Sequence, residues 1–204
     1  MLVMDSSEEV ANLFRLKSEL RKELNERINS LTPEEIREES SIVTQKVLQH
    51  PKYVKAESVS IYLSFDKEIQ TDNIVYDIFE KGKKCYIPRY FQGKPMEMVR
   101  LHSYEDYQNL PRNRWNIKQP PKDEARENAL ETGKLDLILM PGLGFTKDGK
   151  RIGRGKGYYD QFLMKCAESL KSYPYTIGLA FKKQMVPDLP TTDEDVNVDE
   201  VISP

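Results

Sequence analysis

One stretch decides the fold: Met140-Pro-Gly-Leu-Gly-Phe-Thr-Lys-Asp-Gly-Lys-Arg-Ile-Gly-Arg-Gly-Lys-Gly-Tyr-Tyr-Asp160. It holds six of the ten glycines of the chain, together with basic side chains. The apolar run 135–140 before it predicts a strand, and the amphipathic run 158–170 after it predicts a helix. Glycines let a backbone turn tightly and approach a ligand closely, and the N–H groups at a helix start attract anions. The stretch therefore predicts a phosphate-binding loop at the carboxyl end of a strand.

The pattern differs from the two best-known phosphate-binding loops. It contains no Gly-x4-Gly-Lys-Ser/Thr, and residues 141–150 separate its later glycines from the predicted strand. A flexible, basic surface loop is the alternative interpretation, so the other residues have to decide between the two.

Composition predicts one soluble domain spanning residues 1–204. A net charge of −2 gives no reason to expect nucleic acid as a partner. Cys85 and Cys166 lie in apolar runs and are typical of reduced core thiols. No apolar run approaches the roughly 20 residues that span a bilayer. The acidic N-terminal stretch is unlike a signal or transit peptide. We therefore expect a cytoplasmic protein with no membrane partner.

Residues 8–29 predict a helix whose apolar stripe contains two cations. The stripe recurs with the helical period, and Lys17 and Arg21 lie within it, four residues apart. Their alkyl stems could cover apolar surface while the charged heads reach water. Alternatively, this face borders an anionic ligand. The stripe consists of Val10, Leu13, Phe14, Leu20, Leu24 and Ile28.

The remaining periodicity predicts an α/β fold with a mostly parallel sheet flanked by helices. Strand 58–64, helix 72–81 and strand 84–88 have the spacing of a βαβ unit, which implies parallel strands. Thr32-Pro-Glu-Glu35 predicts a capped helix start, and that helix should end near His50. Further strands are expected at residues 96–101, 135–140, 175–181 and 196–202.

Polar residues follow several of these strands. Glu68, Arg89 and the pair Lys182-Lys183 come after predicted strands, as the glycine-rich stretch does. Ligands of parallel sheets bind outside the carboxyl ends of the strands, so we expect these groups to converge. Asp160, at a helix start, and Asp195, in an acidic turn, would ligate Mg²⁺ if both face bound phosphates. Cations, Mg²⁺ and polyphosphate together favour phosphoryl transfer.

The chain resembles the 5-formyltetrahydrofolate cyclo-ligase (5,10-methenyltetrahydrofolate synthetase) family over nearly its whole length. The long motif 139–160 is the specific part of the likeness. Shorter matches occur in the expected order: Lys17-x3-Arg21, Ile61-Tyr-Leu-Ser64 with Glu68, Ile87-Pro-Arg89, Trp115-Asn-Ile117, Leu179-Ala-Phe181 and Val198-Asp-Glu-Val201.

The resemblance implies a Rossmann-like layered α/β fold and an ATP- and Mg²⁺-dependent ligase. Such an enzyme converts 5-formyltetrahydrofolate to 5,10-methenyltetrahydrofolate with release of ADP and phosphate. Arg151, Arg154 and Lys156 would act on the transferring phosphate, and Asp160 and Asp195 would hold Mg²⁺. A monomer is expected. The implied ATP contacts are Lys17, Arg21, Arg151, Ile152, Gly153, Arg154, Gly155, Lys156, Gly157, Tyr158 and Tyr159, and the implied folate contacts are Leu63, Glu68, Trp115 and Tyr158.

Two other classes of protein fit part of the pattern. A nucleotide- or folate-binding module without turnover would keep the glycine-rich loop and Trp115 but could lose the metal ligands. A sugar-phosphate enzyme would need a carboxylate as general base, for which Glu68 is the candidate, and would not need ATP. Trp115 itself could either bury against the domain or offer its ring to a ligand.

Overall fold

The computed structural model describes residues 6–91, 93, 95–113 and 116–204, with the side chains from Val10 onward. Its centre is a six-stranded sheet in the order β3-β2-β1-β4-β7-β8. Only β3 runs antiparallel to its neighbour, and the other pairings of this sheet are parallel. The expected mostly parallel sheet is confirmed. The strands are β1 (Ser58–Ile61), β2 (Lys84–Arg89), β3 (Glu97–Leu101), β4 (Leu137–Met140), β7 (Tyr175–Leu179) and β8 (Glu200–Ile202).

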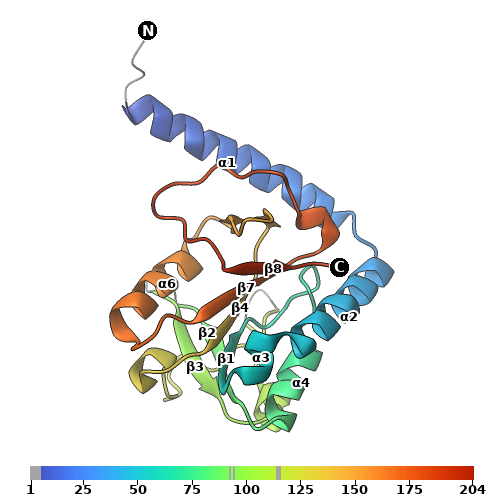
Figure 1. The fold of residues 1–204 in the computed structure, drawn as a ribbon, viewed down its shortest axis with the longest axis vertical. Coiled ribbons are helices and arrows are strands. Elements are labelled where there is room, and N and C mark those ends of the chain that lie inside the picture. The colour runs from blue at the N-terminus through green and yellow to red at the C-terminus, as the bar shows by residue number, and fades with distance from the viewer. Residues whose placement is uncertain (1–5, 92, 94, 114–115) are drawn as a thin grey trace.

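Helices cover both faces of the sheet, because its buried strands are apolar on both sides (Figure 1). In β4, Leu137 and Leu139 pack into one core with α2 and α4, while Ile138 and Met140 pack into a second core with α6. The helices are α1 (Ser6–Asn29), α2 (Pro33–Gln49), α3 (Pro51–Lys55), α4 (Asp72–Glu80), α5 (Tyr104–Asn109) and α6 (Tyr158–Ser169), with 3-10 turns η1 (Ala129–Thr132) and η2 (Lys182–Gln184).

The start of α2 confirms the predicted cap. The Glu35 N–H donates to Thr32 Oγ1 at 3.1 Å, and the Thr32 N–H donates to Glu35 Oε2 at 2.7 Å. The helix ends at Gln49, just before His50, as expected. Several predicted strands are shorter than expected, since β1 ends at Ile61, β7 ends at Leu179 and β8 begins at Glu200. Several apolar residues beyond these ends, among them Leu63 and Phe181, are still buried.

The glycine-rich stretch begins with a hairpin that the periodicity did not predict. Strands β5 (Gly144–Phe145) and β6 (Arg151–Ile152) pair antiparallel beside the main sheet. The Phe145 ring lies against Gly142 and Gly178, where an added Cβ would come within 2.5 Å and 2.4 Å of ring atoms. These glycines therefore allow close packing of the hairpin on the sheet.

Gly178→Ala is expected to destabilise the protein by about 1–3 kcal/mol, because the new methyl group would overpack against Phe145. Urea unfolding of four proteins measures this: the wild type, Gly178→Ala, Phe145→Leu and the double variant. The glycine substitution should cost clearly less in the Phe145→Leu background. An equal cost in both backgrounds would contradict the proposed clash.

Helix α1 buries only the second half of its apolar stripe. Leu24 and Ile28 are 0 % and 2 % exposed, whereas Val10 and Phe14 are 52 % and 64 % exposed. Figure 1 shows the reason: the first half of α1 runs past the edge of the domain, over the segment that leads into β8. The predicted helix is confirmed, and only the second half of its apolar stripe contributes to the core.

Candidate active site

The second half of the glycine-rich stretch forms a loop between β6 and α6. Gly157 caps α6 with φ +64°, a left-handed conformation in which glycine is unstrained. The Arg21 Nε–H donates to the Gly153 carbonyl at 2.9 Å, so helix α1 holds this loop from the outside. Gly155 lies under the same guanidinium, at 3.4 Å from the Arg21 Cζ to an added Cβ. The loop thus lies against the cationic part of α1.

Lys17 reaches the site rather than water. It is only 6 % exposed and forms an ion pair with Asp195 Oδ2, in the segment that leads into β8. Thr192 donates to the same oxygen from its N–H and from Oγ1, at 2.6 Å and 3.0 Å. Burial pushes the pKa of Asp195 up, but the hydrogen bonds from Lys17 and Thr192 outweigh it and hold the pKa below its ordinary value. The interpretation of Lys17 as a snorkelling surface residue is therefore wrong.

Arg151 forms a second ion pair at the other end of the loop. Its Nη2 lies 2.9 Å from Asp160 Oδ1, and its side chain is 5 % exposed. The Val196 N–H, one residue after Asp195, donates to the same Asp160 oxygen at 3.3 Å. Arg151 Nε is buried and has no hydrogen-bond partner among the described residues. A buried donor without a partner is costly, so this guanidinium is fit to take an anion.

Arg154 joins the glycine-rich loop to the loop after β1. Its guanidinium lies over the Phe65 ring, 4.6 Å from Cζ to the ring centroid. Glu68 is next to it, and the Phe65 N–H donates to Glu68 Oε2 at 3.5 Å. Burial raises the pKa of Glu68 to about 8, although Arg154 and the Phe65 N–H act in the opposite direction. The glycine-rich loop and Glu68, whose carboxyl group is the predicted folate contact, are thus neighbours.

Aromatic side chains line the start of α6. The Tyr158 ring lies 5.2 Å from that of Tyr90, and the Arg151 guanidinium lies 5.7 Å from the centroid of the Tyr159 ring. Gln119 holds Tyr90 in place by bonding both its N–H and its carbonyl, at 3.2 Å and 3.3 Å. Tyr90 and Phe65 were not among the predicted site residues. Both residues follow the carboxyl end of a strand, β1 or β2, and this position could have marked them as site residues.

The other predicted site residues differ in whether they expose a side chain, backbone or neither to the site. Ile152 and Leu63 are buried in the core, at 3 % and 6 % exposed, so they shape the site more than they line it. Gly153 and Gly155 offer backbone, and Lys156 is exposed on the loop. Trp115 lies outside the described residues.

Two cations that were expected to converge on the site, Arg89 and Lys183, are engaged with structural partners instead. Arg89 is 7 % exposed and is engaged at the sheet edge, 2.9 Å from Glu97 and 2.6 Å from the Glu124 carbonyl. Lys183 bonds Ser30 Oγ at 3.1 Å, between α1 and α2. Both residues do lie at the carboxyl ends of strands, as predicted, but their side chains bond neighbouring parts of the fold.

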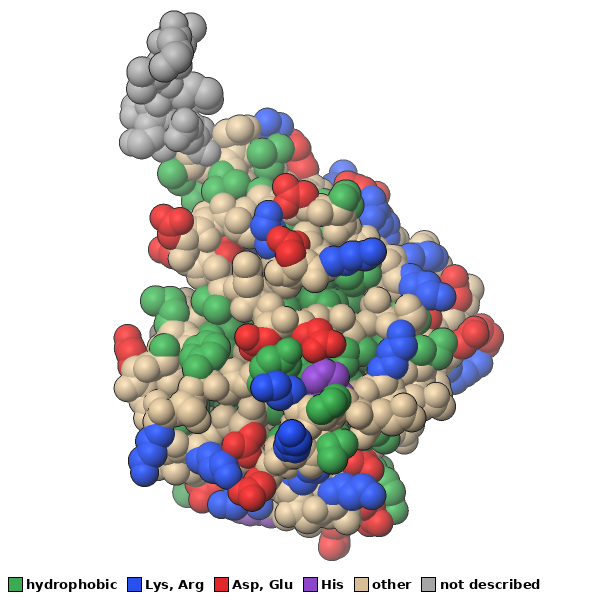
Figure 2. Space-filling view, viewed as in Figure 1, with side chains coloured by type: hydrophobic (Ala, Val, Ile, Leu, Met, Phe, Trp, Pro, Cys, Tyr) green, Lys and Arg blue, Asp and Glu red, His purple; other side chains and the backbone are tan. Residues whose placement is uncertain are grey.

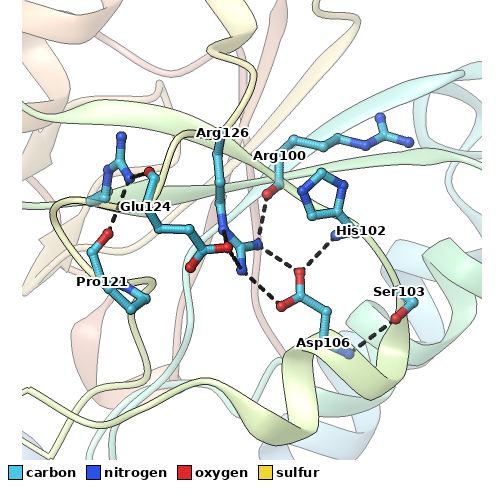
Figure 3. Close-up of polar contacts among 8 residues, drawn as sticks. Arg100, His102, Ser103, Asp106, Pro121, Glu124 and Arg126 are labelled. Carbon is cyan, nitrogen blue, oxygen red and sulfur yellow. Dashed lines mark hydrogen bonds and ion pairs between the residues drawn. The ribbon is translucent and has the colours of Figure 1, made fainter.

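Another arginine with a buried side chain, Arg126, fixes the segment between β3 and β4 (Figure 3). Arg126 donates to Asp106 at 2.6 Å and 2.8 Å, to Glu124 at 2.9 Å and to the Arg100 carbonyl at 3.0 Å. The His102 N–H also donates to Asp106. Arg89 adds hydrogen bonds to the Pro121 and Glu124 carbonyls at 3.2 Å and 2.6 Å, so the two arginines hold this segment against the sheet edge.

The donor set fits a magnesium polyphosphate better than a metal alone. The structure holds no group of three or more metal-ligating side chains within the described residues. On Asp160 and on Asp195, all described hydrogen bonds fall on one oxygen, which leaves the other for a ligand. Mg²⁺ in nucleotide sites uses one or two carboxylates together with phosphates and water. Figure 2 shows acidic and basic side chains interspersed over the face drawn, without a broad patch of one sign on that face.

Fold and site together define an α/β protein with a basic, glycine-rich loop at the carboxyl edge of a mostly parallel sheet. A model of the 5-formyltetrahydrofolate cyclo-ligase family matches residues 14–204. The chain is 50% identical over 187 residues to 5-formyltetrahydrofolate cyclo-ligase of Mus musculus, which covers 91% of this chain and 92% of that protein. The solution structure of 5,10-methenyltetrahydrofolate synthetase of Aquifex aeolicus has a TM-score of 0.72 at 30% identity, over 91% of this chain and 88% of that one. A 5,10-methenyltetrahydrofolate synthetase of Mycoplasma pneumoniae shares the fold with a TM-score of 0.69 at 22% identity, over 92% of this chain and 98% of that one.

The chain therefore belongs to the 5-formyltetrahydrofolate cyclo-ligase family. The predicted family, fold, ligase class and reaction are confirmed at the level of the family. The roles of individual residues stay predictions.

Proposed function

We propose that this protein converts 5-formyltetrahydrofolate to 5,10-methenyltetrahydrofolate in an ATP- and Mg²⁺-dependent reaction that releases ADP and phosphate. One observation carries the assignment of roles: the glycine-rich loop lies between the cations of α1 on one side and the Phe65–Glu68 loop on the other. A nucleotide on the loop and a folate beside Glu68 would meet at Arg154.

In this proposal the phosphates of ATP lie on residues 151–159. Backbone N–H groups of the loop and the start of α6 bind phosphate oxygens, and Lys17 and Arg21 close the site from α1. Arg151, Arg154 and Lys156 neutralise the charge that grows on the γ-phosphate. Fixed cations aimed at developing charge are an effective catalytic device because they need no reorganisation during the reaction.

On the folate side, Leu63 and Tyr158 would shape an apolar wall, and Trp115 would offer an aromatic face. Glu68 would accept hydrogen bonds from the pterin ring. Holding the formyl oxygen in line with the γ-phosphate would supply much of the remaining acceleration. Asp160 and Asp195 would hold Mg²⁺, which neutralises phosphate charge when bound.

The chemistry follows in two steps. The formyl oxygen attacks the γ-phosphorus, ADP leaves, and the formyl carbon becomes activated as an iminium phosphate. N10 of the folate then adds to that carbon and loses its proton, and phosphate departs with the former formyl oxygen. This sequence needs no protein nucleophile.

The predicted monomer and cytoplasmic location remain proposals. In the part of the chain that the structure describes, no helix is both long and apolar enough to cross a bilayer. The small folate substrate fits the family, and nucleic acid has no role in this scheme.

Turnover tests the proposal. Purified protein with 5-formyltetrahydrofolate and MgATP should generate the absorbance of the methenyl product, and omission of ATP should abolish it. Folate and nucleotide binding without product would instead support a non-catalytic binding module.

The raised pKa of Glu68 leads us to expect that folate binding depends on pH. With a pKa of about 8, the free protein carries the proton on Glu68 at neutral pH. Two ring N–H donors need two acceptor oxygens, so binding favours the ionised carboxylate and releases that proton. The Kd for 5-formyltetrahydrofolate should fall as pH rises toward about 8, by up to about tenfold per pH unit, and then level off. The Kd of Glu68→Gln, measured by titration calorimetry, should vary little over this range, and a wild-type slope in this variant would refute the assignment.

A further inference from the structure

Two cations of the site, Lys17 and Arg151, are paired with carboxylates of the site itself. Lys17 is held by Asp195 and Arg151 by Asp160, and both cationic side chains are less than a tenth exposed. Neither pair is helical surface pairing, since Lys17 and Asp195 are 178 residues apart and come from α1 and from the segment before β8. Two positive and two negative groups are thus matched within the site.

The proposed function gives these four groups other partners. Lys17 and Arg151 would bind phosphate oxygens, whereas Asp160 and Asp195 would bind Mg²⁺. Polyphosphate alone could meet Arg21, Arg154 and Lys156, but it would find Lys17 and Arg151 engaged with two carboxylates that repel it. Mg²⁺ alone would meet engaged carboxylates beside two repelling cations. Either ligand alone would therefore leave two largely buried charged side chains without a partner of opposite sign, which is strongly unfavourable.

Together the two ligands remove this conflict. If phosphate takes the cations while the metal takes the carboxylates, every charge keeps a partner of opposite sign. The two pairs are also connected, because the Val196 N–H bonds Asp160 and Val196 directly follows Asp195. A shift of Asp195 toward a metal therefore moves the residue that holds Asp160.

We propose that nucleotide and metal bind this site by partner exchange, in which Lys17 and Arg151 pass from Asp195 and Asp160 to phosphate as the carboxylates pass to the metal. The inference rests on the proposed function and adds metal selectivity to it: the protein's own ion pairs weaken the binding of metal-free nucleotide. Arg151 Nε is buried and has no partner among the described residues, so its donor can be satisfied only when the site rearranges, as the exchange requires.

The exchange is tested by measuring the affinity of the protein for ATP in the absence of folate, so that no turnover takes place. Titration calorimetry compares ATP in EDTA with ATP in excess Mg²⁺. The wild type should bind MgATP at least about tenfold more tightly than metal-free ATP. Equal affinities would overturn the exchange and leave the proposed function standing. Failure to bind either form would overturn both.

Asp195→Asn separates exchange from simple metal bridging. It releases Lys17, so metal-free ATP should bind about tenfold more tightly than in the wild type, while the advantage of Mg²⁺ shrinks. Asp188→Asn is the matched control. It removes one carboxylate charge beside Lys150 on the exposed hairpin, where Asp188 is 77% exposed, and should change neither affinity.

A double-mutant cycle with Lys17→Met shows whether Lys17 is the group released. In the Lys17→Met background, Asp195→Asn should improve metal-free binding by no more than about twofold. The same gain in both backgrounds would show a general field effect and would overturn the exchange. Thermal melts identify variants that fail to fold; in that case the wild-type comparison of the two ATP forms decides alone.

Discussion

Arg154→Ala is expected to lower kcat/KM by about a hundredfold or more while the fold stays intact. The guanidinium lies between the glycine-rich loop and the Phe65–Glu68 loop, where the γ-phosphate would be transferred. Removing one preoriented donor to developing charge commonly has an effect of this size. Because Arg154 is exposed and contacts one ring, the free energy of unfolding should fall by no more than about 1 kcal/mol.

The methenyl absorbance assay measures the loss, and thermal melts check the fold. Lys147→Ala is the control, since Lys147 is an exposed cation at the tip of the same hairpin. It should retain wild-type turnover. If Arg154→Ala also retained it, the assignment of Arg154 to the transferring phosphate would be wrong.

Asp160→Asn has the second large expected effect, on stability and on turnover together. It leaves the Arg151 guanidinium, 5% exposed, without its opposite charge. An unpaired charge in that position should cost about 2–4 kcal/mol in the free energy of unfolding. Turnover should fall at least about a hundredfold, because the proposed metal ligand is lost as well.

Urea unfolding of Asp160→Asn and Asp188→Asn makes the comparison, since both remove one carboxylate charge from an ion pair. The Lys150–Asp188 pair is exposed, so its loss should cost less than about 1 kcal/mol. Equal losses in the two variants would contradict the structural role of the Arg151–Asp160 pair. Replacing both residues, with Arg151→Met and Asp160→Leu, should recover part of the stability but no turnover.

Local signals in the sequence were enough to predict the sheet and most helices. The Thr32–Glu35 capping box depends on four consecutive residues and is present as expected. The βαβ spacing predicted parallel β1 and β2, and the glycine-rich stretch predicted a loop that leads into α6. Each of these features is set by neighbouring residues, so periodicity and turn chemistry suffice.

Features that depend on distant partners could not be derived in this way. The apolar stripe of α1 has the helical period throughout, yet nothing in it reveals that the domain ends near Lys17 and leaves Phe14 exposed. Likewise, Arg89 stands at the carboxyl end of a strand as a ligand-binding residue would. Its engagement with Glu97 and with the Glu124 carbonyl depends on an antiparallel edge strand and on a loop 35 residues away.

The most important such feature is the pairing of charges within the site. Lys17, Asp160 and Asp195 were each predicted as site residues from motif position and resemblance. Their contacts with one another require the three-dimensional meeting of α1, the glycine-rich loop and the segment before β8. Sequence could name the groups, whereas their resting partners are a property of the fold.

The transfer of the formyl oxygen to phosphate tests the central claim most directly. 5-Formyltetrahydrofolate labelled with ¹⁸O in the formyl group is incubated with the protein and MgATP, and the released phosphate is analysed by mass spectrometry. The account predicts methenyl product and ADP in equal amounts, with one ¹⁸O atom in each phosphate released. Unlabelled phosphate, or methenyl product formed without ATP, would contradict it.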